Sequence, residues 1–195
     1  MPNQRRAASL LSMAALVAVA GCNGLFGGDD AHLRVVLSSD VSPTATALMS
    51  SADEHEGSRL SDLFQSANVT LSSVLVRDQD GKLINVSFSL PVIVDVVKVE
   101  GGKQIVLPDG TLPAGTYDQV VFVISSVSGT TKDGTTITID PPGGGWTAVV
   151  PICQVTVAQG STQTVAITLN VRSSFLQLGE HWGFQPRFRS LTSCT

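Results

Sequence analysis

The sequence predicts an all-β protein, built as an antiparallel sandwich of two β-sheets. Hydrophobic residues make up 43% of the 195-residue chain and charged residues only 14%, and Val, Thr, Ser and Gly are plentiful, a composition typical of strands. Roughly nine or ten short stretches show strand patterns, and Gly, Pro and Asp-Gly pairs separate them. A sandwich is therefore favoured over any βαβ arrangement, with a closed barrel as the second interpretation.

The amino terminus has the pattern of an export signal. Arg5 and Arg6 give a positive start, and Ala7 to Ala20 is an apolar run with the length of a signal-peptide core, too short to span a bilayer comfortably. The run ends in Val19-Ala20-Gly21-Cys22, which resembles the lipobox of bacterial lipoproteins. That resemblance implies a lipoprotein signal peptide over residues 1–21 and a Cys22 that carries acyl chains such as palmitate. The alternatives are an ordinary secretory leader and an uncleaved transmembrane anchor.

The same region predicts where the protein resides. Several acyl chains on Cys22 would anchor the domain in a membrane more durably than one myristoyl group. Asn23 stands where aspartate would signal inner-membrane retention in many Gram-negative bacteria, so we expect the bacterial cell envelope and its outer membrane, facing the periplasm or the surface. Residues 22–31 should be a lipidated, glycine-rich tether. The net charge of −4 gives no reason to expect nucleic acid as a partner.

The domain itself is expected over residues 32–191, with a short tail at 192–195. Leucine and valine alternate with other residues in the first strand, at 32–39. Residues 41–67 break the pattern with Pro, Ser, Thr and charge, and we expect a loop insertion that ends in one or two helical turns. Strands at 68–77 and 82–88 follow. Asp80-Gly81 should turn a tight hairpin between them, because glycine supplies the positive φ that such a turn needs.

The second half of the chain continues the strand pattern. Further strands are expected at 92–97, 105–107, 135–139, 146–157 with an interruption at Pro151, and 162–171. Asp109-Gly110 and Asp133-Gly134 should turn hairpins as Asp80-Gly81 does. Gln185 to Arg189 should form a closing edge strand, since proline is tolerated at edges.

The longest strand begins after Leu112-Pro113-Ala114-Gly115-Thr116-Tyr117 and runs to Ser126. Apolar side chains fill both of its faces, with Val121 and Val123 on one and Val120, Phe122 and Ile124 on the other. Both faces should therefore be covered, which predicts a central strand.

The order of these pieces is similar to that of a known family. It runs from the opening strand near Ser39-Asp40, through Asn68-Val69-Thr70-Leu71 and the strand with Asp95, to Leu112–Tyr117 and a closing Phe184-Gln185-Pro186-Arg187-Phe188. That succession resembles the bacterial and archaeal lipoprotein domains of the domain of unknown function 4382 family, from about His32 to Leu191. Leu112–Tyr117 is also similar to pieces of transthyretin-like sandwiches, so the resemblance implies a transthyretin-like or immunoglobulin-like fold. The family offers no catalytic residues to transfer.

Few residues indicate a reaction. His32, His55 and His181 are far apart, and no serine lies in a Gly-x-Ser-x-Gly elbow, so we expect neither an enzyme nor a cofactor. A triad assembled from distant residues is the alternative. Asp53, Glu54, His55 and Glu56 are the candidate ligands for a divalent metal, although adjacent polar residues in a loop are usually only solvated. Asp95 lies among valines and should find a charged or hydrogen-bonding partner.

Tryptophan and cysteine residues supply the remaining candidates. Trp146 and Trp182 are the candidate ligand surface, where sugar rings would stack at one end of the sandwich, and core packing is the alternative. Cys153 and Cys194 are the thiols left once Cys22 is lipidated, and an oxidising compartment favours a disulfide between them. The alternative is a buried Cys153 and a free Cys194.

The leading functional hypothesis is an envelope-anchored lipoprotein with a non-enzymatic binding or structural module. It would contact the membrane through its lipid and an unknown envelope protein or glycan through its sandwich. A carbohydrate-binding accessory module of the cell surface is the second hypothesis, and an envelope enzyme is the third.

Overall fold

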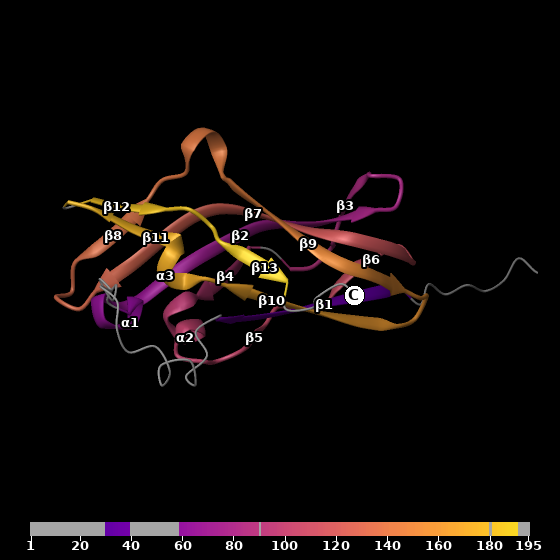
Figure 1. Ribbon diagram of the computed structural model, residues 1–195, viewed down its shortest axis with the longest axis horizontal. Helices are drawn as coiled ribbons and strands as arrows, with labels where there is room; N and C mark the ends of the chain where they lie inside the picture. The colour runs from indigo at the N-terminus through magenta and orange to yellow at the C-terminus, as the bar shows by residue number, and fades with distance from the viewer. Residues whose placement is uncertain (1–29, 40–58, 90, 180, 191–195) are drawn as a thin grey trace, which may run out of the picture.

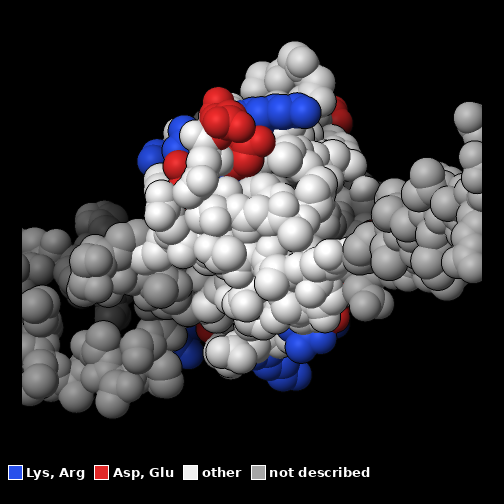
Figure 2. Space-filling model, turned by 90° about the vertical axis from the view of Figure 1, so that its right-hand side faces the viewer, with Lys and Arg blue, Asp and Glu red and all other residues white. Residues whose placement is uncertain are grey.

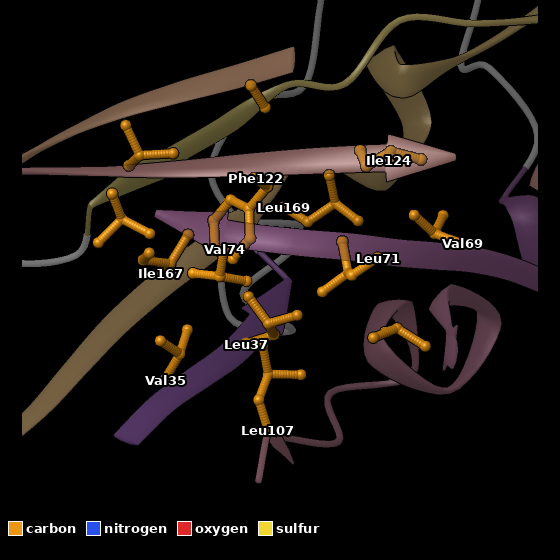
Figure 3. Close-up of a cluster of buried hydrophobic side chains, with 14 of the residues drawn as sticks. Val35, Leu37, Val69, Leu71, Val74, Leu107, Phe122, Ile124, Ile167 and Leu169 are labelled. Carbon is orange, nitrogen blue, oxygen red and sulfur yellow. The ribbon is translucent and has the colours of Figure 1, made fainter. Parts of the chain in front are cut away.

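The sandwich is confirmed by the computed structural model, which describes residues 30–39, 59–89, 91–179 and 181–190. A six-stranded and a five-stranded sheet enclose one hydrophobic core (Figure 1). Figure 3 shows side chains from β1, β2, β7 and β10 meeting between the two sheets. Helices are short, and among the described residues none is long and apolar enough to cross a membrane.

The six-stranded sheet is organised around two long antiparallel strands, β2 (Phe64–Asp78) and β7 (Gly115–Thr131). β3 (Leu83–Asn85) and β4 (Val92–Asp95) pair with successive parts of β2. β8 (Thr136–Ile139) and β9 (Trp146–Val157) pair with successive parts of β7. β7 is therefore a central strand, as predicted. β9 continues past Pro151 as a strand, but its register against β7 shifts between Pro151 and Val155, so the predicted interruption takes the form of an irregularity in the pairing.

The two faces of β7 differ more than its sequence suggests. Val120, Phe122 and Ile124 are fully buried in the core. On the outer face Val121 is also buried, but its neighbour Val149 on β9 is 53% exposed. Val121 is thus shielded by its cross-strand neighbours in the sheet, and the prediction that both faces are covered holds only in part.

The five-stranded sheet is centred on β1 (Ala31–Ser39). β5 (Ile105–Val106) and β6 (Gly110–Leu112) lie on one side of it, and β10 (Thr162–Leu169) and then β13 (Phe188–Ser190) lie on the other. β1 and β10 run parallel, whereas the sequence predicted antiparallel pairing throughout. The turn after β9 explains the difference: His32 donates its N–H to the carbonyl of Ser161 (2.8 Å), so β10 and β1 start side by side.

Within the described residues, three short helices lie at the corners of the sandwich, α1 (Leu60–Leu63), α2 (Val96–Glu100) and α3 (Val171–Ser174). A 3₁₀ turn, η2 (Pro142–Gly144), precedes β9. The strand predicted over 92–97 ends at Asp95, because the Asp95 carboxylate caps α2 by accepting from the N–H of Val97 (3.3 Å). Asp95 also accepts from the N–H of Ala67 and pairs with Lys98 at 3.2 Å, so its predicted need for partners is confirmed.

A buried carboxylate joins the helices. Glu100, at the end of α2, is only 6% exposed and accepts from the backbone N–H groups of Leu60 (3.0 Å) and Ser61 (2.8 Å) at the start of α1. The guanidinium of Arg172 in α3 lies 3.6 Å from the same carboxylate. β2 follows α1 directly, so strand structure already begins at Phe64, inside the predicted insertion.

The Asp-Gly pairs take two different roles. Gly81 and Gly134 have φ of 80° and 89° in hairpin turns, as predicted. Gly110 instead lies in β6, where a Cβ atom would be 2.3 Å from Val86 Cγ1 and 2.6 Å from Phe88 Cδ1. The predicted Asp109-Gly110 turn is wrong, because that glycine serves a close approach of the chain around Ser87, which bridges to Thr111.

The turn into β7 is held by a buried tyrosine. Tyr117 is 2% exposed, and its hydroxyl donates to the carbonyl oxygen of Pro113 (2.6 Å). Burial, and to a smaller extent the charge of Asp78, raises the pKa of the Tyr117 hydroxyl. Gly115 is the first residue of β7 and is not among the glycines with positive φ, so this hydrogen bond fixes the turn rather than a special glycine conformation.

Candidate functional site

One end of the sandwich carries an open hollow of about 430 Å³, which we call the Trp182 hollow. Its wall is built from three segments that are distant in sequence: α1, the turn between β7 and β8, and the hairpin of β11 (Phe175–Leu178) and β12 (His181–Phe184). Figure 1 shows these segments together at the left-hand end of the molecule.

The β11–β12 hairpin contributes Gln177 and Trp182, which pair opposite each other and so project from the same face. Trp182 is half-buried and packs edge-on against Phe64, with ring centroids 4.7 Å apart. The open end of the hairpin is held by Phe175 and Phe184, which are cross-strand partners and pack together with ring centroids 5.1 Å apart. The hairpin is therefore fixed to the core by aromatic contacts, and Trp182 has a defined position at the hollow.

The turn between β7 and β8 is held by its own hydrogen bonds. Thr131 donates its N–H to the carbonyl of Thr135 (2.9 Å), and the Asp133 carboxylate accepts from the Thr131 hydroxyl and from the N–H of Thr135 (3.1 Å). These hydrogen bonds lower the pKa of the Asp133 carboxyl, and the bond from the Thr131 hydroxyl has the largest effect. Lys132 donates its N–H to the carbonyl of Leu63 (2.9 Å), which ties the turn to α1.

Several polar groups at the hollow remain available for a ligand. Within the part of the chain that the structure describes, the Lys132 ammonium and the Gln177 amide have no hydrogen-bond or ion-pair partner. Asp62 uses Oδ2 to accept from the N–H of Arg59 (3.1 Å) and keeps Oδ1 for other donors. With Asp62 and Asp133 negative and Lys132 positive, the site carries one net negative charge at neutral pH.

The two tryptophans that were predicted as a ligand surface lie in different environments. Trp146 is only 9% exposed and packs on Phe184 in an edge-on contact at 5.1 Å. Trp182 lines the hollow. Burial gives Trp146 a packing role, so a sugar platform that needs both rings does not form from these positions.

The other candidate residues are dispersed or lie outside the described residues. His32 is on β1 and the exposed His181 is on β12, in different sheets. Cys153, on β9, is disulfide-bonded, and its partner is not among the described residues. The pairing of Cys153 with Cys194 stays a prediction. Cys22, Cys194 and the candidate metal ligands Asp53, Glu54, His55 and Glu56 all lie outside the described residues.

The opposite end of the sandwich carries a smaller polar hollow of about 280 Å³, next to Asn85, Ser87 and Thr111. Figure 2 looks onto this end and shows charged side chains of both signs at its upper and lower margins, with an uncharged area between them. Arg77 binds Asp118 through two hydrogen bonds of 2.8 and 2.9 Å, which lower the pKa of Asp118.

The sequence pointed to only part of the Trp182 hollow. It predicted the Asp133-Gly134 turn and named Trp182, but it gave no reason to connect them with Asp62, Lys132 or Gln177. The sequence did contain a pattern that assigns Trp146 to the core. Every second residue of β9 projects from the same face, and Ala148, Val150 and Ile152, which share the face of Trp146, are all apolar and buried. That alternation identifies Trp146 as a core residue.

These observations define an all-β sandwich domain with a ligand-sized hollow at one end. Residues 57–186 match the family described as Domain of unknown function (DUF4382), and because the match spans more than half of the chain, this protein belongs to that family. The predicted family is confirmed, although the matched region starts after β1 and not at His32. It includes every residue that lines the Trp182 hollow. No curated protein and no solved structure matches the chain.

Proposed function

We propose that this protein is an envelope-anchored lipoprotein whose sandwich is a non-enzymatic binding module, with the Trp182 hollow as its ligand site. The observation that carries the anchor is the apolar run ending in Val19-Ala20-Gly21-Cys22. The observation that carries binding is a hollow of ligand size whose walls are fixed while several of its polar groups are unengaged.

The position of the hollow suits an anchored protein. Ala31, the first residue of β1, pairs with Leu112 just before β7 begins, whereas Thr131, the last residue of β7, lines the hollow. A 17-residue strand separates these points, which corresponds to roughly 55 Å at about 3.3 Å per residue. A lipid on Cys22 would therefore place the membrane near one end of the sandwich and leave the ligand site free at the other.

The anchor predicts a clear effect of removing Cys22. The end of the domain next to the tether shows charges of both signs, including the Arg77–Asp118 pair, and offers no basic surface to anionic lipids in this view (Figure 2). We therefore expect Cys22→Ala to move the protein from the detergent phase to the aqueous phase in detergent phase separation. Asn23→Asp is the matched control, since it keeps the lipid-bearing thiol. Unchanged partitioning of Cys22→Ala would overturn the lipoprotein proposal.

The binding role is tested by site-specific photo-crosslinking in intact envelopes. A photoreactive residue in place of Thr135, an exposed residue that lines the hollow, should give an adduct that weakens when Lys132→Ala is added. The same residue in place of Gln159, an exposed position in the turn after β9, is the control and should not give that adduct. Identical adducts from both positions, or an adduct indifferent to Lys132→Ala, would show that the hollow is not the ligand site.

The non-enzymatic part of the proposal is supported by the separation of the described histidines, His32 and His181, in two different sheets. A general base needs to lie within hydrogen-bond reach of the proton that it removes, usually together with a nucleophile. Turnover of an ester or peptide panel by the purified protein, lost in His181→Ala, would contradict this part.

A further inference from the structure

We infer that the ligand of the Trp182 hollow is a neutral saccharide, an inference that rests on the proposed binding function of the same site. The size of the hollow agrees with this ligand. At about 430 Å³ it falls within the range of small-molecule sites, which is on the order of 300–1,000 Å³, and it has room for a short saccharide.

The charges of the site argue against other classes of ligand. An anion would meet the carboxylates of Asp62 and Asp133 with only one ammonium to compensate. A cation would be attracted by the two carboxylates but repelled by the Lys132 ammonium, so no single charge suits the whole site. A purely apolar ligand would remove water from charged groups and give them no hydrogen bond in return, which is costly. A neutral, polar ligand avoids all three penalties.

Hydroxyl groups fit the available polar atoms. Each hydroxyl both donates and accepts, so one ligand can donate to Asp62 Oδ1 while it accepts from the Lys132 ammonium and the Gln177 amide. Two of these bonds would involve a charged group, and such hydrogen bonds are stronger than neutral ones. Neighbouring hydroxyls at fixed spacing on a ring are the hallmark of a saccharide.

Trp182 supplies the remaining feature. Its indole offers flat apolar surface for the C–H groups of a sugar ring, together with one N–H donor. The contact with Phe64 (4.7 Å) and the pairing with Gln177 hold the indole in place before a ligand arrives. Because the turn at Thr131–Thr135 is also held by internal hydrogen bonds, little conformational entropy is lost on binding.

The test is binding of the full-length protein, purified in detergent, to an array of neutral and acidic oligosaccharides. Titration calorimetry then measures the affinity for the neutral sugar that binds best. Gln177→Ala and Lys132→Ala should each raise its Kd about tenfold, the usual effect of losing one good hydrogen bond at a binding site. Gln159→Ala and Lys103→Ala are the matched controls at exposed positions outside the hollow and should leave Kd unchanged.

Trp182→Phe gives a second variant that is less disruptive than truncation to alanine. It keeps an aromatic ring against Phe64 and removes the N–H and part of the ring area, so the affinity should fall while the thermal midpoint stays close to that of the wild type. An array on which neutral sugars do not bind, or on which only acidic sugars bind, would overturn the saccharide inference. The crosslink from position 135 would then still report whether the hollow binds something else. An equal loss of sugar affinity in the control variants would show that the sugar does not bind in the Trp182 hollow.

Discussion

Glu100 should determine the stability of the corner where the chain enters α1 and β2. Its carboxylate accepts two backbone N–H groups, from Leu60 at 3.0 Å and Ser61 at 2.8 Å, and its side chain is 2% exposed. Glu100→Gln keeps the shape of the side chain but turns one acceptor oxygen into an NH₂ donor. One buried N–H then loses its partner, which should lower the free energy of unfolding by about 1–3 kcal/mol.

Glu100→Ala should cost more, about 3–5 kcal/mol, because both N–H groups lose their acceptor and a cavity remains. Arg172→Ala separates the two contributions to this corner. The Arg172 side chain is 38% exposed and lies 3.6 Å from the carboxylate, and the buried carboxylate keeps its two backbone N–H donors in this variant, so the loss should be smaller than that of Glu100→Ala.

The assay is urea unfolding followed by circular dichroism, with hydrogen exchange at Leu60 and Ser61 as a local probe. Exchange at these two amides should accelerate more in Glu100→Gln than exchange in the middle of β7. A Glu100→Gln midpoint equal to that of the wild type would refute the reasoning, because the two hydrogen bonds would then contribute nothing. An Arg172→Ala cost as large as that of Glu100→Ala would assign the stability to the ion pair instead.

Three further predictions concern other parts of the sandwich. Gly110→Ala should lower the free energy of unfolding by about 1–3 kcal/mol in urea, because its Cβ would lie 2.3 Å from the buried Val86, while Gly101→Ala, with no contact below 3.5 Å, should not. The raised pKa of Tyr117 means that its stabilisation is complete below about pH 10 and is lost as the pH rises through the higher folded pKa. Tyr117→Phe should therefore flatten the alkaline end of the stability profile, and an unchanged profile would contradict the assignment. Non-reducing mass spectrometry of the exported protein should find Cys153 joined to Cys194, and two alkylatable thiols would exclude that bond.

Local patterns predicted the strands well, because alternation reports which face of a strand is buried. The Val92–Val97 run shows where such patterns fail: its β-branched residues favour a strand, yet the Asp95 cap starts α2 at Val96. The role of Gly110 could not be predicted either. Glycine is needed there because Val86 packs so closely against the backbone that no side chain fits, and that contact is not visible in the sequence. The Trp182 hollow joins three distant segments, and no local pattern brings Asp62, Lys132 and Gln177 together.

The parallel pair of β1 and β10 has a consequence for how the protein folds. His32 pairs with Thr162, and 162 − 32 gives a separation of 130 residues along the chain. The antiparallel neighbours β5 and β6 each pair with only a short part of β1. Contacts at such separation slow folding, because the entropy of closing the loop is lost before the pairing compensates for it. A nascent chain that ends before Thr162 would leave one long edge of β1 without a partner strand and open to association with other chains. The five-stranded sheet can therefore assemble only late in synthesis. The chain depends on its carboxy-terminal third to protect β1 from aggregation.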